Sequence, residues 1–189
     1  MLLTQYEPMV SYLGRELRQR VSASTAVNWA TFHKRTVNLE YDLVVTAANL
    51  ASINDALFKV GVAAVDSWSK IAALVRSYNL ILGAADGVAN STALPVEADY
   101  SQVGVKSLQT RFPNPADAPA RGNAVTLLGN VIDRSNRDEV DTVAELDSLA
   151  DIVSRVIRIA GGKTDTLSAD EWKRLHVSPE LSADQLRIV

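Results

Sequence analysis

The stretch VDTVAELDSLADIVSRVIRIAGG, residues 140–162, decides the fold. Its apolar residues recur at steps of three and four, the spacing of one face of an α-helix; they are Val143, Leu146, Leu149, Val153, Val156 and Ile157. Thr142 and Glu145 fit a capping box, in which each side chain satisfies a backbone N–H of the first turn. Gly161 and Gly162 follow, and glycine readily takes the left-handed conformation that ends a helix. The stretch therefore predicts a long helix over about 141–160 with one buried face.

The same pattern occurs about 75 residues earlier in the chain, which indicates an internal repeat. Val65-Asp66-Ser67 aligns without a gap to Val140-Asp141-Thr142. The apolar residues that follow keep the register: Ile71, Leu74, Tyr78, Ile81 and Leu82 align to Leu146, Leu149, Val153, Val156 and Ile157. The residues before it also align, Leu50, Ile53, Ala56 and Leu57 with Val125, Leu128, Val131 and Ile132. The register is thus kept over two helices and the linker between them.

Each repeat is predicted to hold three helices. The long helices cover 67–82 and 141–160, the medium helices 46–58 and 123–132, and the short helices 96–103 and 169–175. Ala98-Asp99-Tyr100 aligns with Asp170-Glu171-Trp172, and Trp68 and Trp172 are expected in the core. The prediction is an all-α fold of tandem small three-helix bundles, with an N-terminal helical segment at 1–44 and repeats at 45–119 and 120–189. Such units often need neighbours to complete their cores.

The composition excludes several kinds of chemistry. No cysteine is present, so disulfides, thiol nucleophiles and thiolate zinc sites are excluded. Two histidines leave little for a metal site, and the net charge of −3 lacks the basic surplus of a general nucleic-acid binder. Met1-Leu2-Leu3 is too short for a signal-peptide core, and no apolar run is long enough to span a membrane.

The motifs that could carry catalysis have simpler interpretations. The carboxylates between 138 and 151 lie where a helix begins, and the helix dipole favours negative charge there, so a solvated helix start is preferred to a metal site. Gly161-Gly162-Lys163-Thr164 ends like a phosphate loop, but Val156 replaces its first glycine and a helix precedes it. His33 and His176 are interpreted as surface residues. No cofactor and no catalytic residue is predicted.

Two segments are candidates for binding a partner. Residues 111–122 hold three prolines and are predicted to form a stiff, displayed loop, because proline removes a backbone donor and restricts its predecessor. Its candidate interaction residues are Arg111, Phe112, Pro113, Pro115 and Arg121. A basic patch with interleaved aromatic residues, comprising Arg15, Arg18, Arg20, Lys34 and Arg35, could contact nucleic-acid phosphates, although a solvated face is preferred.

Five segments carry a family resemblance: VTAANLASINDAL (45–57), LGAADGVANSTALP (82–95), ADYSQVGV (98–105), LLGNVID (127–133) and VDTVAELDSLAD (140–151). They resemble the GA-like helical repeats of very large bacterial surface proteins, often described as adhesins. The resemblance implies a non-catalytic structural or adhesive segment at the cell surface, with neighbouring repeats or a protein as partner. The alternatives are an intracellular helical interaction module in the cytoplasm and, less favoured, a nucleic-acid-binding protein.

Overall fold

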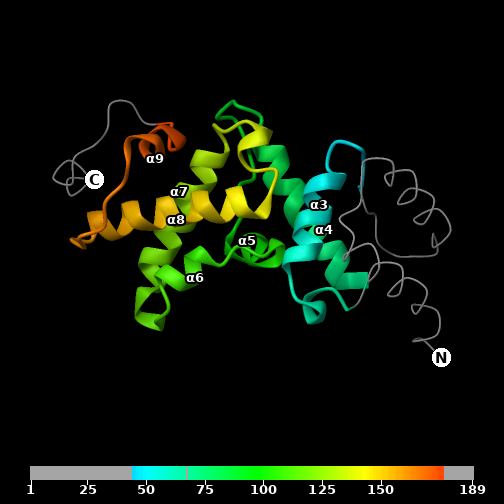
Figure 1. The fold of residues 1–189 in the computed structure, drawn as a ribbon, viewed down its shortest axis with the longest axis horizontal. Helices are drawn as coiled ribbons and strands as arrows, with labels where there is room; N and C mark the ends of the chain where they lie inside the picture. The colour runs from blue at the N-terminus through cyan, green and yellow to red at the C-terminus, as the bar shows by residue number, and fades with distance from the viewer. Residues whose placement is uncertain (1–43, 67, 177–189) are drawn as a thin grey trace.

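The computed structural model describes residues 44–66 and 68–176, and over these ranges it is helical, without a β-strand (Figure 1). The helices are α3 (Leu50–Lys59), α4 (Trp68–Ala84), α5 (Glu97–Val103), α6 (Ser107–Arg111), α7 (Ala118–Ile132), α8 (Val143–Ala160) and α9 (Ala169–Arg174). Three 3-10 turns accompany them: η2 (Val62–Ala64), η3 (Pro115–Asp117) and η4 (Arg137–Glu139). The prediction of an all-α fold is confirmed for this part of the chain.

The sequence of α8 explains where this helix begins and ends. The Glu145 backbone N–H donates to Thr142 Oγ1 at 3.2 Å, and the Thr142 N–H donates to Glu145 Oε2 at 3.1 Å, which is the predicted capping box. Beyond the last turn, Gly162 has φ +81°, in the left-handed region. The predicted long helix is therefore confirmed, together with its start and stop signals.

The other helices predicted for the two repeats are present with shifted ends, whereas the predicted N-terminal helical segment at 1–44 lies outside the described residues except for residue 44. Helix α3 begins at Leu50, four residues after the predicted start at Thr46, and α7 begins at Ala118, five residues before the predicted Asn123. Helix α6 was not predicted. Trp172 is buried, as expected, whereas the Trp68 side chain lies outside the described structure.

Two groups of helices pack around one continuous core. Helices α3, α4 and α5 contact one another, as do α6, α7 and α8, and α3 contacts α8 to join the groups. The predicted boundary between residues 119 and 120 lies inside α7, and α6, from the predicted first repeat, packs against α7 and α8. The buried residues form a single cluster that extends from Leu50 to Leu175.

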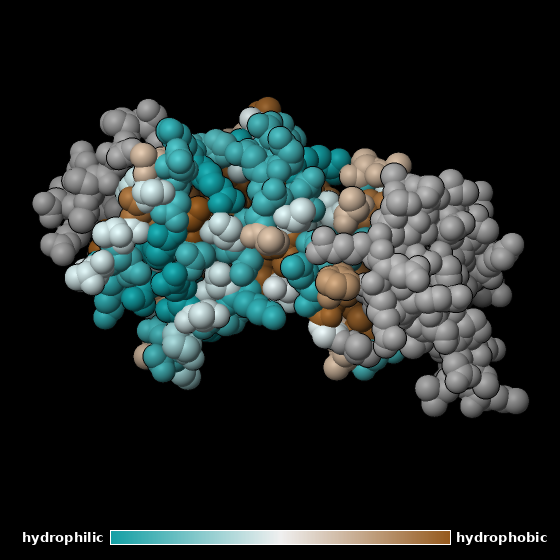
Figure 2. All heavy atoms as spheres, in the orientation of Figure 1, coloured by the Kyte–Doolittle hydropathy of each residue, from teal (hydrophilic) through white to brown (hydrophobic). Residues whose placement is uncertain are grey.

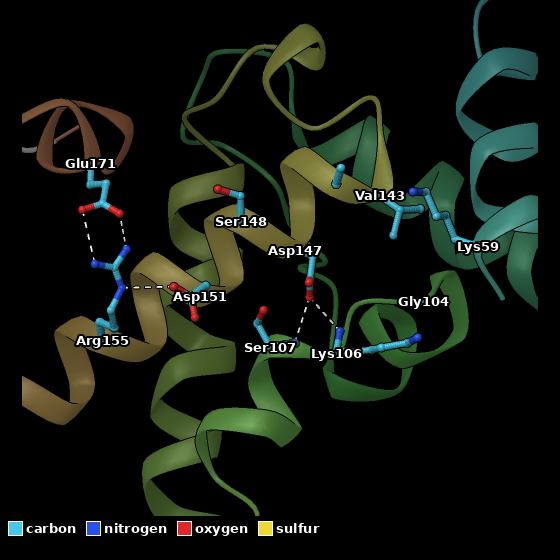
Figure 3. A pocket seen from close by; sticks show the side chains of 11 residues that line it. Lys59, Gly104, Lys106, Ser107, Val143, Asp147, Ser148, Asp151, Arg155 and Glu171 are labelled. Atoms are coloured by element: carbon cyan, nitrogen blue, oxygen red, sulfur yellow. Dashed lines mark hydrogen bonds and ion pairs between the residues drawn. The ribbon is translucent and has the colours of Figure 1, made fainter. Parts of the chain in front are cut away.

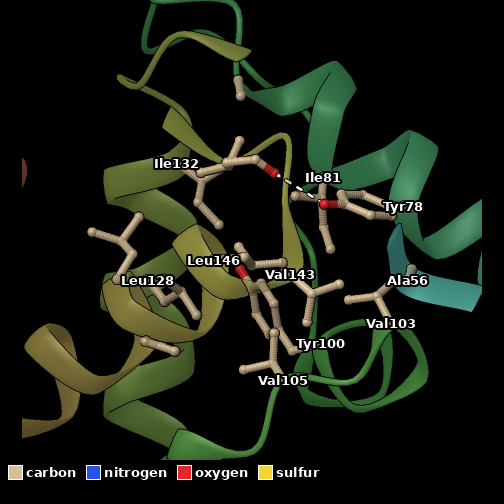
Figure 4. Packing of buried hydrophobic residues seen from close by; sticks show 14 of the residues in the cluster. Ala56, Tyr78, Ile81, Tyr100, Val103, Val105, Leu128, Ile132, Val143 and Leu146 are labelled. Carbon is tan, nitrogen blue, oxygen red and sulfur yellow. Dashed lines mark hydrogen bonds between the residues drawn. The ribbon is translucent and has the colours of Figure 1, made fainter. Parts of the chain in front are cut away.

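The centre of this core brings together side chains from both groups (Figure 4). Tyr78 and Tyr100 are fully buried, near Ile132 of α7 and Leu146 of α8. The Tyr78 hydroxyl donates to the Val140 carbonyl oxygen at 3.3 Å, which ties α4 to the chain just before α8. Burial raises the pKa of both phenols well above the ordinary value, so neither ionises in the folded state.

Candidate functional site

The segment predicted as a displayed loop is mostly helical. Arg111 ends α6, η3 begins at Pro115, and α7 continues from Ala118. Phe112 is only 4% exposed and belongs to the core. The prediction of a stiff loop over 111–122 is therefore wrong. Proline lacks a backbone N–H, but the first N–H groups of a helix have no intrahelical partner, so Pro115 and Pro119 fit in first turns.

The two arginines of this segment are tied into the fold. Arg111 Nε lies 2.6 Å from Asp151 Oδ1 on α8. Arg121 Nε lies 2.9 Å from Glu97 Oε1 on α5, and Arg121 Nη1 donates to the Phe112 carbonyl oxygen at 2.9 Å. Pro113 and Pro115 are exposed. An interaction role for these residues stays a prediction, now on a folded surface between α6 and α7.

The basic patch lies outside the described residues. This applies to all five of its members, Arg15, Arg18, Arg20, Lys34 and Arg35, and also to His33. Its role in contacting nucleic acid stays a prediction.

A groove of about 520 Å³ opens where α6, α8 and α9 meet the ends of α3 and α5 (Figure 3). Its lining is mainly polar: Lys59, Gly104, Lys106, Ser107, Val143, Ala144, Asp147, Ser148, Asp151, Arg155 and Glu171. Figure 2 shows that hydrophilic side chains cover most of the face formed by α7, α8 and α9. The groove is therefore a mainly polar concavity shared by several helices.

The carboxylate at the middle of the groove caps another helix. Asp147 Oδ1 accepts hydrogen bonds from the backbone N–H groups of Lys106 at 2.7 Å and Ser107 at 2.8 Å (Figure 3). These are the first N–H groups of α6, which have no partner within the helix. Asp147 thus satisfies two donors of a helix that is distant from it in the chain.

The far end of the groove is held by alternating charges. Arg155 pairs with Glu171 on α9, and Arg155 Nε also lies 3.1 Å from Asp151 Oδ2. The network continues through the neighbours of these groups: Asp151 to Arg111 at 2.6 Å, Arg111 to Asp165 at 3.7 Å, and Asp165 to Arg158 at 2.8 Å. It connects α6, α8 and α9 with the segment between α8 and α9.

The ionisation of this network follows from its hydrogen bonds. The hydrogen bond from Arg155, and then that from the Ser168 backbone, lower the pKa of Glu171 from 4.5 to about 2. The hydrogen bond with Glu171 raises the pKa of Arg155. Both groups stay charged across the physiological range, and each charge lies beside an opposite one. This arrangement connects α8 and α9 through paired charges.

The carboxylates that precede and begin α8 behave differently from one another. Desolvation, followed by the hydrogen bond with Glu145, raises the pKa of Asp141. Glu145 serves the capping box, so the prediction of a helix start is confirmed there. Asp147 and Asp151 are half-buried, and besides being partly solvated both bind groups on α6, which the sequence did not predict. Among residues 44–66 and 68–176, no cluster of histidine and carboxylate side chains could hold a metal ion.

His176 lies at the end of α9, as predicted, and is exposed. Its Nε2 is 3.1 Å from Ser135 Oγ, and its φ of +55° places it in the left-handed region. The Ser135 hydroxyl is buried and donates to the Val131 carbonyl oxygen at 3.1 Å. The serine is therefore a connector between the end of α7 and the end of α9.

Sequence reasoning missed the groove because its pairs join distant segments. Two local signals were readable: Asp151 and Arg155 are four residues apart, and Ser168 with Glu171 forms a capping box at α9. No helix within the described ranges is long and apolar enough to cross a membrane. Comparisons of the chain with family models, curated proteins and solved structures found no match.

Proposed function

We propose that the chain is a non-catalytic structural or adhesive segment of a bacterial surface protein, built from tandem three-helix units of about 75 residues. The observation that carries the proposal is that two pairs of structural elements begin at the interval of the sequence repeat. The turn η2 begins at Val62 and η4 at Arg137, while α4 begins at Trp68 and α8 at Val143. Both pairs have the same offset as Val65 and Val140, which align in the sequence.

The buried positions of the two units support the same interpretation. Ile53 and Leu128 are both fully buried, and so are Leu74 and its counterpart Leu149. Tyr100 on α5 and Trp172 on α9 each place an aromatic ring in the core. A unit that repeats its core at a fixed interval is typical of proteins that extend by adding units.

The chemistry of the groove favours a structural role over catalysis. Asp147, Asp151, Arg155 and Glu171 are used in capping and ion pairs that hold helices together. A catalytic site usually contains groups whose pKa values lie near the working pH. These four groups, all in the lining of the groove, serve the fold instead.

Surface labelling of the source bacterium tests the proposal. An antibody raised against the full chain is expected to label intact cells and to lose its signal after brief treatment of intact cells with a protease. Permeabilised cells serve as the control for total protein. Labelling only after permeabilisation would overturn the surface assignment and favour the intracellular interaction module.

A further inference from the structure

The junction between the two units contains a cap that crosses from one unit to the other. Asp55 Oδ2 on α3 accepts a hydrogen bond from the backbone N–H of Val143 at 2.8 Å. Val143 is the first residue of α8, so this N–H has no partner within its own helix. The first unit therefore satisfies a donor at the start of the second unit's long helix.

The end of α5 completes the same junction. Gly104 has φ +99°, and a Cβ atom there would lie 3.2 Å from Val60 Cγ1 and 3.8 Å from Val143 Cγ1. Lys59, next to Val60, lines the groove beside Val143 (Figure 3). The C-terminal ends of α3 and α5 thus form one surface that receives the first turn of α8.

The second unit carries a corresponding surface. In the ungapped alignment that pairs Val65 with Val140, Asp55 corresponds to Asn130, Lys59 to Arg134 and Val60 to Ser135; in the aligned short helices Gly104 corresponds to His176. The contact between Val60 and Gly104 has a counterpart in the hydrogen bond between Ser135 and His176.

The conformation and chemistry of these residues match their counterparts. His176 adopts a positive φ, which is uncommon outside glycine, at the place where Gly104 does so. Asn130 on α7 and Arg134, two residues after the end of α7 at Ile132, are exposed. Asparagine, like aspartate, is a preferred acceptor for helix N–H groups, and arginine keeps the positive charge of lysine. In the described residues the Asn130 side chain has no hydrogen-bond partner.

We infer that Asn130, Arg134 and His176, the last held by Ser135, form a docking surface for the first turn of the long helix of a further unit of the same repeat. Asn130 would accept the hydrogen bond that Asp55 accepts at the existing junction. The inference rests on the proposed function, because it requires a partner built as the two described units are. It adds which residues make the contact and which part of the partner they bind.

A lengthened protein tests the inference. The full chain is followed directly by a second copy of its residues 115–189, which places another Val143 one repeat interval after the first. The midpoint of thermal unfolding is measured for the full chain and for the lengthened chain, each with and without the substitution Asn130→Ala. Loss of an N-cap costs about 1 kcal/mol, which in a chain of this size lowers the midpoint by about 2–4 °C.

The matched control is Asn123→Ala, an exposed asparagine on the same helix with the same gain in helix propensity. In the lengthened chain we expect Asn130→Ala to have an unfolding midpoint about 2–4 °C below that of the control Asn123→Ala. In the full chain we expect the two variants to have the same midpoint. Asn130→Asp should keep the midpoint of the lengthened chain at its original value, because aspartate also accepts the hydrogen bond. Asp55→Ala should lower the midpoints of both the full chain and the lengthened chain.

Three outcomes overturn the inference: equal effects of the two alanine variants in both chains, separate unfolding of the added unit, or failure of the lengthened chain to fold as a monomer. These results would leave surface labelling of the natural protein unchanged. Loss of surface labelling would refute the proposed function without altering the measured coupling at Asn130.

Discussion

Replacing Glu171 by glutamine tests the charge network at the end of the groove. The Glu171 carboxylate accepts hydrogen bonds from the Arg155 guanidinium and, at 2.8 Å, from the Ser168 backbone N–H. Glutamine keeps the size of the side chain and one carbonyl oxygen, but it lacks the negative charge. The substitution therefore weakens the attachment of α9 to α8 without opening a cavity in the core.

The expected loss follows from the exposure of the pair. The side chains of Arg155 and Glu171 are 16% and 29% exposed, so solvent weakens the pair only in part. Hydrogen bonds to charged groups contribute about 1.5–3 kcal/mol, and partial exposure reduces this to about 1–2 kcal/mol. For a domain of this size, each kcal/mol corresponds to about 2–4 °C in Tm, so we expect a decrease of about 2–8 °C at pH 7.

The pH dependence has a definite sign. The pKa of Glu171 is lowered by folding from 4.5 to about 2, so the folded state favours the charged carboxylate. Its contribution to stability is fully present above pH 4.5 and is lost as the pH falls from 4.5 to about 2. The difference in free energy of unfolding between the natural chain and Glu171→Gln should therefore shrink over this interval.

Urea denaturation followed by circular dichroism at several pH values measures this difference. Asp170→Asn is the matched control, because Asp170 lies on the same helix, has a side chain that is 90% exposed and pairs with Lys173. We expect the control to change stability by less than about 0.5 kcal/mol. Equal losses in the two variants, or a Glu171→Gln loss that is the same at pH 7 and pH 3, would refute this account of the network.

Three further substitutions test other parts of the structure. Phe112→Ala should lower the free energy of unfolding by about 3–5 kcal/mol because the ring is buried, whereas Val88→Ala, at an exposed position, should lower it little. Equal losses for the two variants in urea denaturation would favour a displayed loop at 111–122. Gly104→Ala should cost at least about 1 kcal/mol, since φ is +99° and the added Cβ would meet Val60 at 3.2 Å; an unchanged Tm would contradict this junction. Asp147→Ala should cost about 1–3 kcal/mol and speed hydrogen exchange in α6, which loses two caps; unchanged exchange at Ser107 would show that α6 does not depend on α8.

Local signals explain why most helices could be predicted from the sequence. Helix α8 has an apolar face, a capping box at Thr142 and a glycine at its end, and each of these lies within a few residues of what it determines. The short helix α9 has a similar box from Ser168 to Glu171. The alignment of the two repeats also identified buried positions in both halves of the chain.

The prediction of a loop at residues 111–122 is wrong because the effect of proline on a helix depends on its position in the helix. Proline disrupts the interior of a helix, but Pro115 and Pro119 stand in first turns, where the missing N–H has no cost. The sequence alone does not show that Phe112 meets the core, because that contact depends on how α6 packs against α7 and α8.

The roles of Asp147 and Asp151 depended on contacts that no local pattern encodes. Both carboxylates sit in the first half of α8, where charge on an exposed helix face is ordinary. Their partners are the start and end of α6, which are 40 residues away in the chain. A five-residue helix such as α6 has little stability alone, so its two capped N–H groups and its ion pair with α8 must determine where it forms.

This dependence bears on how the two units are joined. Helix α6 follows the first group of helices in sequence but packs with the second, and Asp55 of the first unit caps α8 of the second. The junction is therefore built from the same core and helix ends that stabilise each unit, and not from a flexible linker. Because the free energy of each unit includes its neighbour, we expect the two to unfold together, as coupled repeats do when the interface between them is large. A segment built in this way holds its two units in a fixed relative position, which suits the proposed structural role.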